Sequence, residues 1–126
     1  MNILAIEDDI DFGDMLELQL TAWGHKVTLT RNWLSMMMTI NTQPFDAIIA
    51  DIETPTGNGL TALSFLSEDE KVREIPKIFV TGLNDAETRN RCEAINAAYV
   101  HKSSTVMVDL KTVLGNLGRT HQTATS

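Results

Sequence analysis

The chain has 126 residues, 43% of them apolar, which is enough for one domain with a packed core and too few for two comfortable ones. Its 10 Lys and Arg against 17 Asp and Glu give a formal net charge of −7, which argues against direct nucleic-acid binding, because that affinity comes mainly from Lys and Arg. The single cysteine, Cys92, excludes an internal disulfide and fits a reducing compartment. Neither a signal peptide nor an apolar run of membrane-spanning length is visible, so we expect a cytoplasmic protein.

Short apolar runs, several of them rich in β-branched residues, alternate with longer segments in which apolar residues recur at helical spacing. The predicted strands cover 2–6, 26–30, 47–50, 76–80 and 97–100. The predicted helices cover 12–23, 34–38, 60–66, 85–95 and 106–117. Residues 51–59 contain Pro55, Gly57 and Gly59 and are predicted to form a loop. We expect a domain of residues 1–118 followed by a polar, frayed tail or the start of a linker over 119–126.

Five alternating strands and helices indicate an α/β fold with right-handed crossovers, in which a parallel sheet carries helices on both faces. The run 47–50 shows no polar alternation, as expected for a strand covered on both sides. In such folds the ligand site lies outside the carboxyl ends of the strands. The residues that directly follow each strand are therefore the candidates for function.

Charged and hydroxyl side chains follow the predicted strands at four points. Asp8 and Asp9 come after the first strand, Asp51 after the third, Thr81 after the fourth and Lys102 just past the fifth. Carboxylates brought this close repel one another, and Mg²⁺ would resolve the conflict because it prefers hard oxygen ligands and keeps waters that a phosphate can displace. The set suits phosphoryl transfer to Asp51, with Asp9 as a direct metal ligand and Asp8 acting directly or through a water.

Over residues 2–118 the chain resembles the receiver domains of two-component response regulators. The resemblance rests on features that occur in the right order along the chain: Asp8-Asp9, Asp51, Pro55, Gly59, Thr81 and Lys102. It implies a flavodoxin-like (βα)5 three-layer sandwich with strand order 2-1-3-4-5. It also implies a phosphorylation-dependent signalling switch that is not an enzyme acting on other molecules.

The resemblance assigns a role to each site residue. Asp51 would accept a phosphoryl group from a phosphohistidine on a histidine kinase or phosphotransfer protein. Mg²⁺ would sit on Asp9, Asp51 and the backbone carbonyl of Glu53. Lys102 and Thr81 would hold the phosphoryl group.

The resemblance also implies an output. Tyr99 would be the switch aromatic that responds to Thr81, and the surface of the fourth helix, fifth strand and fifth helix would meet a downstream protein or output domain. A homodimer on phosphorylation is possible.

Three positions depart from the family pattern. Ser103 stands where a proline with a cis bond is usual, and we expect a trans bond because a cis bond before a non-proline residue costs about 3 kcal/mol. Asn96 stands near a common glycine, and Asn tolerates the left-handed conformation. Glu53 adds a carboxylate near the pocket, and we hypothesise that it alters the lifetime of the phosphorylated state, which dephosphorylation rates of wild type and Glu53→Ala would test.

Several alternatives stay open at this point. Asp8 and Asp9 could be N-cap residues of the first helix with no role in a site. Thr81 could be a turn residue, Lys102 an ordinary surface lysine, and Tyr99 a static strand residue. The run from Asp51 to Thr54 also resembles the first motif of proofreading-type 3′–5′ exonucleases and of haloacid-dehalogenase-type phosphatases, although both place that motif on their first strand. A phosphate-independent protein-binding module on the same fold is the main functional alternative.

Overall fold

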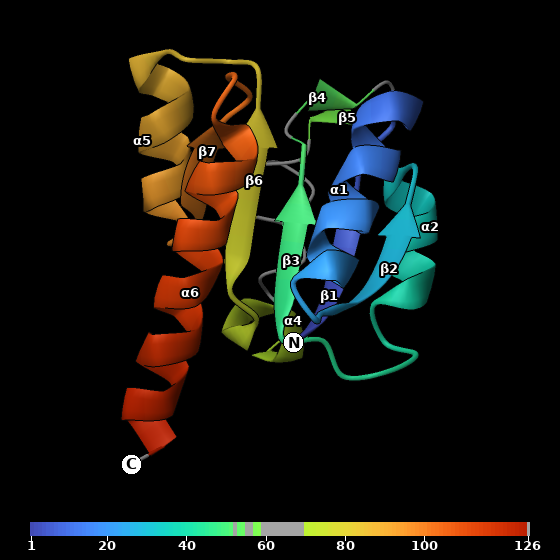
Figure 1. Cartoon of the computed structure of the whole chain (residues 1–126), viewed down its shortest axis with the longest axis vertical. Helices are drawn as coiled ribbons and strands as arrows, with labels where there is room; N and C mark the ends of the chain where they lie inside the picture. The colour runs from blue at the N-terminus through green and yellow to red at the C-terminus, as the bar shows by residue number, and fades with distance from the viewer. Residues whose placement is uncertain (52, 55–56, 59–69, 126) are drawn as a thin grey trace.

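The computed structural model of the protein describes residues 1–51, 53–54, 57–58 and 70–125. Its main sheet has five parallel strands in the order β2-β1-β3-β6-β7 (Figure 1). The strands are β1 (Asn2–Ile6), β2 (Lys26–Thr30), β3 (Ala47–Ala50), β6 (Lys77–Thr81) and β7 (Ala98–His101). Counted along the chain, this is the predicted order 2-1-3-4-5, so the predicted doubly wound fold is confirmed.

Helices cover both faces of the sheet. They are α1 (Ile10–Ala22), α2 (Trp33–Thr39), α4 (Glu70–Glu74), α5 (Ala86–Ala94) and α6 (Val106–Thr125). Leu16 and Leu20 of α1 pack with Leu110 and Leu114 of α6 in one core cluster, and α1 and α6 lie in front of the sheet in Figure 1. Apolar residues of α2, α4 and α5 join the opposite strand faces in a second cluster.

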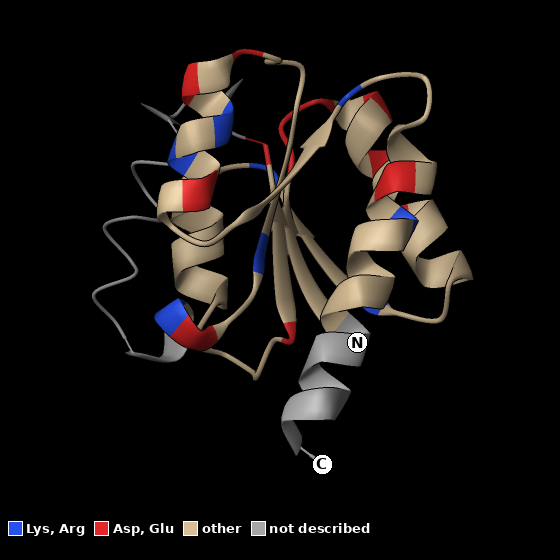
Figure 2. Ribbon diagram, turned by 90° about the vertical axis from the view of Figure 1, so that its left-hand side faces the viewer, with Lys and Arg blue, Asp and Glu red and all other residues tan. Residues whose placement is uncertain are grey.

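Successive residues of each strand supply opposite layers, as the period of two requires. Ile3 and Ala5 of β1 point into the α1 and α6 layer, whereas Leu4 and Ile6 point into the other. Charged residues lie mainly on helices and loops (Figure 2), and Lys77 is a buried exception. Its Nζ donates to the carbonyl oxygens of Val72 and Ile75, which satisfies backbone acceptors at the end of α4.

The structure differs from the sequence prediction in three places. A short antiparallel pair, β4 (Glu53–Thr54) and β5 (Gly57–Asn58), forms inside the predicted loop. Helix α4 was not predicted, while the predicted helix over 60–66 lies outside the described residues. Helix α6 continues to Thr125 into the predicted tail, because the polar residues after Leu117 include no proline to stop it. The domain boundary at residue 118 stays a prediction.

Helix α5 packs weakly and depends on its N-cap. Its buried residues are only Thr88 and Cys92, and the Asp85 carboxylate accepts a hydrogen bond of 2.9 Å from the Thr88 amide. The hydrogen bonds from the Thr88 hydroxyl and amide lower the pKa of Asp85 below its ordinary value of 3.8. The cap therefore stabilises the fold while the carboxylate is charged.

We expect Asp85→Ala to lower the melting temperature. Asp85→Asn should lower it much less, because Asn also caps helices. Since the folded pKa lies below the unfolded one, the contribution of Asp85 is present above pH 3.8 and is lost as the pH falls through the folded value. Thermal unfolding followed by circular dichroism should thus show a difference between wild type and Asp85→Ala that shrinks in acid. A constant difference at all pH values would contradict this role.

Candidate functional site

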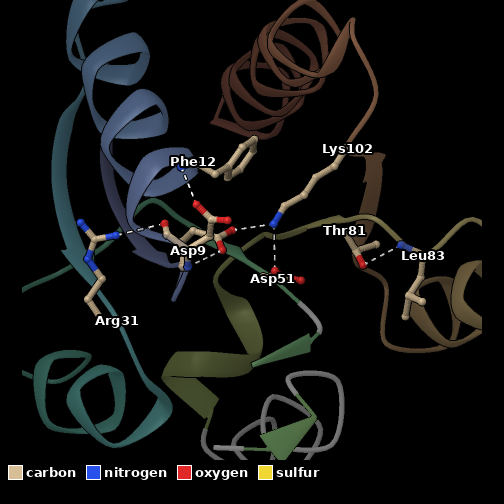
Figure 3. Close-up of polar contacts among 8 residues, drawn as sticks. Asp9, Phe12, Arg31, Asp51, Thr81, Leu83 and Lys102 are labelled. Atoms are coloured by element: carbon tan, nitrogen blue, oxygen red, sulfur yellow. Dashed lines mark hydrogen bonds and ion pairs between the residues drawn. The ribbon is translucent and has the colours of Figure 1, made fainter. Parts of the chain in front are cut away.

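Three of the predicted site residues, Asp51, Thr81 and Lys102, lie together at the carboxyl ends of the strands (Figure 3). Asp51 follows β3 and is 8% exposed. Its amide donates to the Ile6 carbonyl at 3.1 Å, which fixes the Asp51 backbone beside the end of β1. The acidic turn after β1 is therefore brought directly next to Asp51.

Lys102 reaches into this pocket from the end of β7. Its amide donates to the Thr81 carbonyl at 2.7 Å, so the β6–β7 pairing continues one residue past β7. Its Nζ lies 2.9 Å from Asp51 Oδ2 and 3.0 Å from Glu7 Oε2. Burial disfavours the charged ammonium, but hydrogen bonds to Asp51 and Glu7 outweigh that penalty and raise the pKa of Lys102. Lys102 is thus a fixed cation that faces two carboxylates.

Glu7 is a site residue that the sequence analysis missed. It is 1% exposed, its amide donates to the Thr30 carbonyl at 3.0 Å, and its Oε1 accepts from the Asp9 amide at 3.1 Å. Burial raises the pKa of Glu7, and the hydrogen bond from Lys102 counters that rise. The signal available in the sequence was its position directly after the buried strand. In the structure the pairing with β2 continues one residue past Ile6.

Among the described side chains, three carboxylates lie close together in the pocket. Oxygen atoms of Glu7, Asp8 and Asp51 all lie within 4.8 Å of one another. Two of these residues are buried and Asp8 is half-buried. Such a group of hard oxygen donors, with Lys102 balancing only part of the charge, fits a divalent cation of the Mg²⁺ type.

Asp9, the predicted direct metal ligand, caps the first helix in the structure. Its Oδ1 accepts a 2.9 Å hydrogen bond from the Phe12 amide, so Asp9 is the N-cap of α1, and its side chain is exposed (Figure 3). Its carbonyl accepts from Arg31 Nη1 at 3.2 Å. The Asp9 carboxylate is thus engaged by the backbone of α1 and lies outside the group formed by Glu7, Asp8 and Asp51, and its predicted metal contact stays a prediction.

Thr81 and Tyr99 are linked through one loop residue. The Thr81 hydroxyl is fully buried and accepts from the Leu83 amide at 3.1 Å (Figure 3). The Tyr99 hydroxyl donates to the Leu83 carbonyl at 2.5 Å. Burial raises the pKa of Tyr99, so its hydroxyl stays protonated and able to donate. A displacement of Thr81 would therefore act on the segment that Tyr99 holds.

The backbone at Ser103 and at Asn96, two positions that depart from the family pattern, has the expected conformation. Among the described residues there is no cis peptide bond, so the bond between Lys102 and Ser103 is trans, as predicted. Asn96 has φ of 60°, the left-handed conformation that we expected Asn to tolerate there. Glu53 belongs to β4, but its side chain is not among those that the structure describes. Pro55 and Gly59 lie outside the described residues.

The fold and the pocket define a doubly wound α/β protein in which clustered carboxylates face a lysine at the carboxyl ends of the strands. A family model described as the response regulator receiver domain matches residues 3–111. The chain belongs to this family of two-component signalling domains.

Individual relatives agree with this assignment. The polar-differentiation response regulator DivK of Brucella anthropi is 32% identical over 112 residues, which are 85% of this chain and 85% of that protein. The receiver domain of the sensor histidine kinase PA1611 of Pseudomonas aeruginosa, whose structure has a magnesium ion in its active-site cleft, is 25% identical. It has a TM-score of 0.81 and covers 93% of this chain and 97% of its own.

CheY4 of Vibrio cholerae has the same fold, with a TM-score of 0.82 at 20% identity over 92% of this chain and 97% of that chain. Other curated relatives are longer, and this chain spans 14%, 19% and 44% of three of them. Within the described part of the chain, every helix is too short or too polar to cross a lipid bilayer.

Proposed function

We propose that this receiver domain accepts a phosphoryl group on Asp51 from a phosphohistidine, in a reaction that requires Mg²⁺. The observation that carries the proposal is the position of the Asp51 carboxylate, which lies 2.9 Å from Lys102 Nζ and forms one acidic group with Glu7 and Asp8. A buried carboxylate flanked by a fixed cation and by metal-type ligands suits charge neutralisation at a transferring phosphoryl group.

Each residue has a defined part in the proposed transfer. An Asp51 oxygen forms the new O–P bond while the P–N bond of the phosphohistidine breaks, and the imidazole keeps the electron pair and takes up a proton. Mg²⁺ bound by Glu7, Asp8 and Asp51, with the Glu53 backbone as a further proposed ligand, would neutralise charge on the phosphoryl oxygens. Lys102 stays beside the phosphorylated carboxyl, and the Thr81 hydroxyl donates to a phosphoryl oxygen.

The proposed output runs through the segment after β6. Once the Thr81 hydroxyl turns toward a phosphoryl oxygen, it loses its contact with the Leu83 amide, and Leu83 is also held by the Tyr99 hydroxyl. We propose that this change reaches the surface of α5, β7 and α6, where α5 has few buried residues and can shift at low cost.

The wider setting is part of the same proposal. The phosphoryl donor would be a histidine kinase or a histidine phosphotransfer protein, and the partner of the switched surface would be a downstream protein or output domain. We place the domain in the cytoplasm, over residues 1–118, without direct nucleic-acid contact because of its charge of −7. We also propose that phosphorylation promotes homodimerisation, which size measurement before and after phosphorylation tests.

Phosphoramidate tests the proposal, because its P–N bond mimics that of phosphohistidine. We expect intact mass spectrometry of the protein incubated with phosphoramidate and Mg²⁺ to show the gain of one phosphoryl group, and a chelator to remove that gain. Mg²⁺ binding without any phosphoryl gain from this donor or from an acyl phosphate would overturn the proposal and favour the phosphate-independent binding module.

The metal ligands can be separated by paired variants. We expect Glu7→Gln and Asp8→Asn each to weaken Mg²⁺ binding by about tenfold or more, since each removes a charge from the acidic group. Asp9→Asn is the matched control, because Asn can also cap α1 and should leave the affinity near wild type. Isothermal titration calorimetry with MgCl₂ measures all three. A loss in Asp9→Asn as large as that in Asp8→Asn would restore Asp9 as the direct ligand.

A further inference from the structure

Lys102 has a third partner besides the two carboxylates. Its Nζ lies 4.4 Å from the centroid of the Phe12 ring (Figure 3). The two ion pairs direct the ammonium toward Asp51 and Glu7, and the ring covers another side of the same charge. The Lys102 side chain is only 21% exposed, so the attraction between cation and ring is little weakened by water.

Phe12 is fixed by the same turn that carries the acidic residues. Its amide is the group that the Asp9 carboxylate caps, at 2.9 Å, in the first turn of α1. Its half-buried side chain packs against the core cluster that includes Leu16 and Val106. The ring thus has one side on the core and one toward Lys102, which gives it little freedom to move away from the ammonium.

An aromatic face differs from the carboxylates in one respect that matters here. It attracts the ammonium without carrying a formal charge or binding a hard divalent cation. When a metal ion or a phosphoryl group takes over the oxygen atoms of Glu7 and Asp51, the attraction of the ring for Lys102 persists. The contact can therefore keep the ammonium in place while its ionic partners change.

We propose that Phe12 is a positioning residue that holds the Lys102 ammonium against Asp51 during phosphoryl transfer. The kinetic part of this inference rests on the proposed function. The part that concerns the position of Lys102 does not, because it can be measured without any phosphoryl donor.

Two substitutions separate the effect of the aromatic face from the effect of an apolar side chain. Phe12→Tyr keeps the aromatic face, whereas Phe12→Leu keeps an apolar side chain but removes the aromatic face. Trp23→Leu is a matched control, because Trp23 ends α1 and carries a cation–π contact with Lys111, at 5.8 Å, away from the pocket. All three variants are first compared with wild type by thermal unfolding, so that a general loss of structure is recognised.

Proton NMR gives the readout that is independent of phosphorylation. We expect the Lys102 εCH₂ protons to be shifted upfield by the ring in wild type and in Phe12→Tyr, and to move to the position of an exposed lysine in Phe12→Leu. A wild-type Lys102 signal without a ring shift would overturn the proposal, because it would mean that the ammonium does not lie on the ring.

The rate of phosphorylation by phosphoramidate at saturating Mg²⁺ gives the second readout. We expect Phe12→Leu to be slower by about 3- to 30-fold, the range that loss of such a contact implies, and Phe12→Tyr and Trp23→Leu to stay near wild type. Mg²⁺ affinity should be unchanged in Phe12→Leu. A Phe12→Leu rate equal to wild type would overturn the positioning role, whereas failure of wild type itself to gain a phosphoryl group would count against the proposed function, with the NMR result still deciding the contact.

Discussion

Asp51→Asn is expected to abolish phosphoryl incorporation from small donors while the protein stays folded. The asparagine amide has nearly the same shape, and its oxygen can still accept from Lys102 Nζ, which lies 2.9 Å from Asp51 Oδ2. It cannot form an acyl phosphate, because the neutral amide is a poor nucleophile and one acceptor oxygen is lost. Intact mass after incubation with acetyl phosphate and Mg²⁺ should show no added phosphoryl group.

Asp46→Asn is the matched control for this variant. Asp46 precedes the other end of β3, is exposed, and accepts a hydrogen bond from the Asn2 amide that an asparagine oxygen can also accept. We expect Asp46→Asn to be phosphorylated like wild type. Full incorporation into Asp51→Asn would show that another residue accepts the phosphoryl group.

Lys102→Met is expected to have the second large effect, because it removes the cation that we propose contacts the phosphoryl group and also the counter-charge of two buried carboxylates. Breaking a buried ion pair from one side typically costs 3–5 kcal/mol, and the 21% exposure of Lys102 reduces this to about 2–3 kcal/mol at neutral pH. Urea unfolding measures the loss, and Lys111→Met, which removes an exposed lysine from α6, serves as the control.

The stability of Lys102→Met should depend on pH in a defined direction. Burial raises the pKa of Glu7 above 4.5, and the hydrogen bond from Lys102 limits that rise, so the variant should raise it further. A carboxyl group with a folded pKa above its unfolded value destabilises the fold at higher pH, and stability returns as the pH falls through the folded value. The free energy of unfolding that the variant loses relative to wild type should therefore be smaller near pH 5 than near pH 7.5.

Mg²⁺ should partly restore the stability of Lys102→Met, because a divalent cation replaces the missing positive charge beside Glu7 and Asp51. The expected gain in the urea midpoint on addition of Mg²⁺ is larger for Lys102→Met than for wild type. A variant as stable as wild type at neutral pH would show that the two ion pairs do not hold the carboxylates.

The fold and much of the site could be predicted from the sequence because both follow from strand positions. The apolar runs at 2–6, 47–50 and 76–80 agree with observed strands to within a residue. Asp51 and Lys102 directly follow strands of the sheet, and Thr81 is the last residue of β6, so the rule for parallel sheets was enough to bring them together.

The sequence could not show which of Glu7, Asp8 and Asp9 point into the pocket. All three are acidic and consecutive, and the direction of each side chain depends on where β1 stops pairing and where α1 begins. The structure carries the pairing through the Glu7 amide to Thr30 and uses Asp9 as a cap, which turns Glu7 inward and Asp9 outward. A difference of one residue in those boundaries would change which side chains reach the pocket.

Phe12 shows a related limit. Its spacing with Leu16 and Leu20 marks it as a core residue of α1, and the structure agrees in part. Its contact with Lys102 joins residues 90 positions apart and depends on how α1 sits over the end of β7. A helical pattern carries no information about such a contact.

Borohydride trapping of the phosphorylated protein tests the central claim most directly, because borohydride reduces an aspartyl phosphate to homoserine. We predict that tandem mass spectrometry, after treatment with acetyl phosphate and Mg²⁺, finds homoserine at position 51 and that a chelator prevents its formation. Homoserine at another position, or none in a protein shown to bind Mg²⁺, would contradict the assignment of Asp51 as the phosphoryl acceptor.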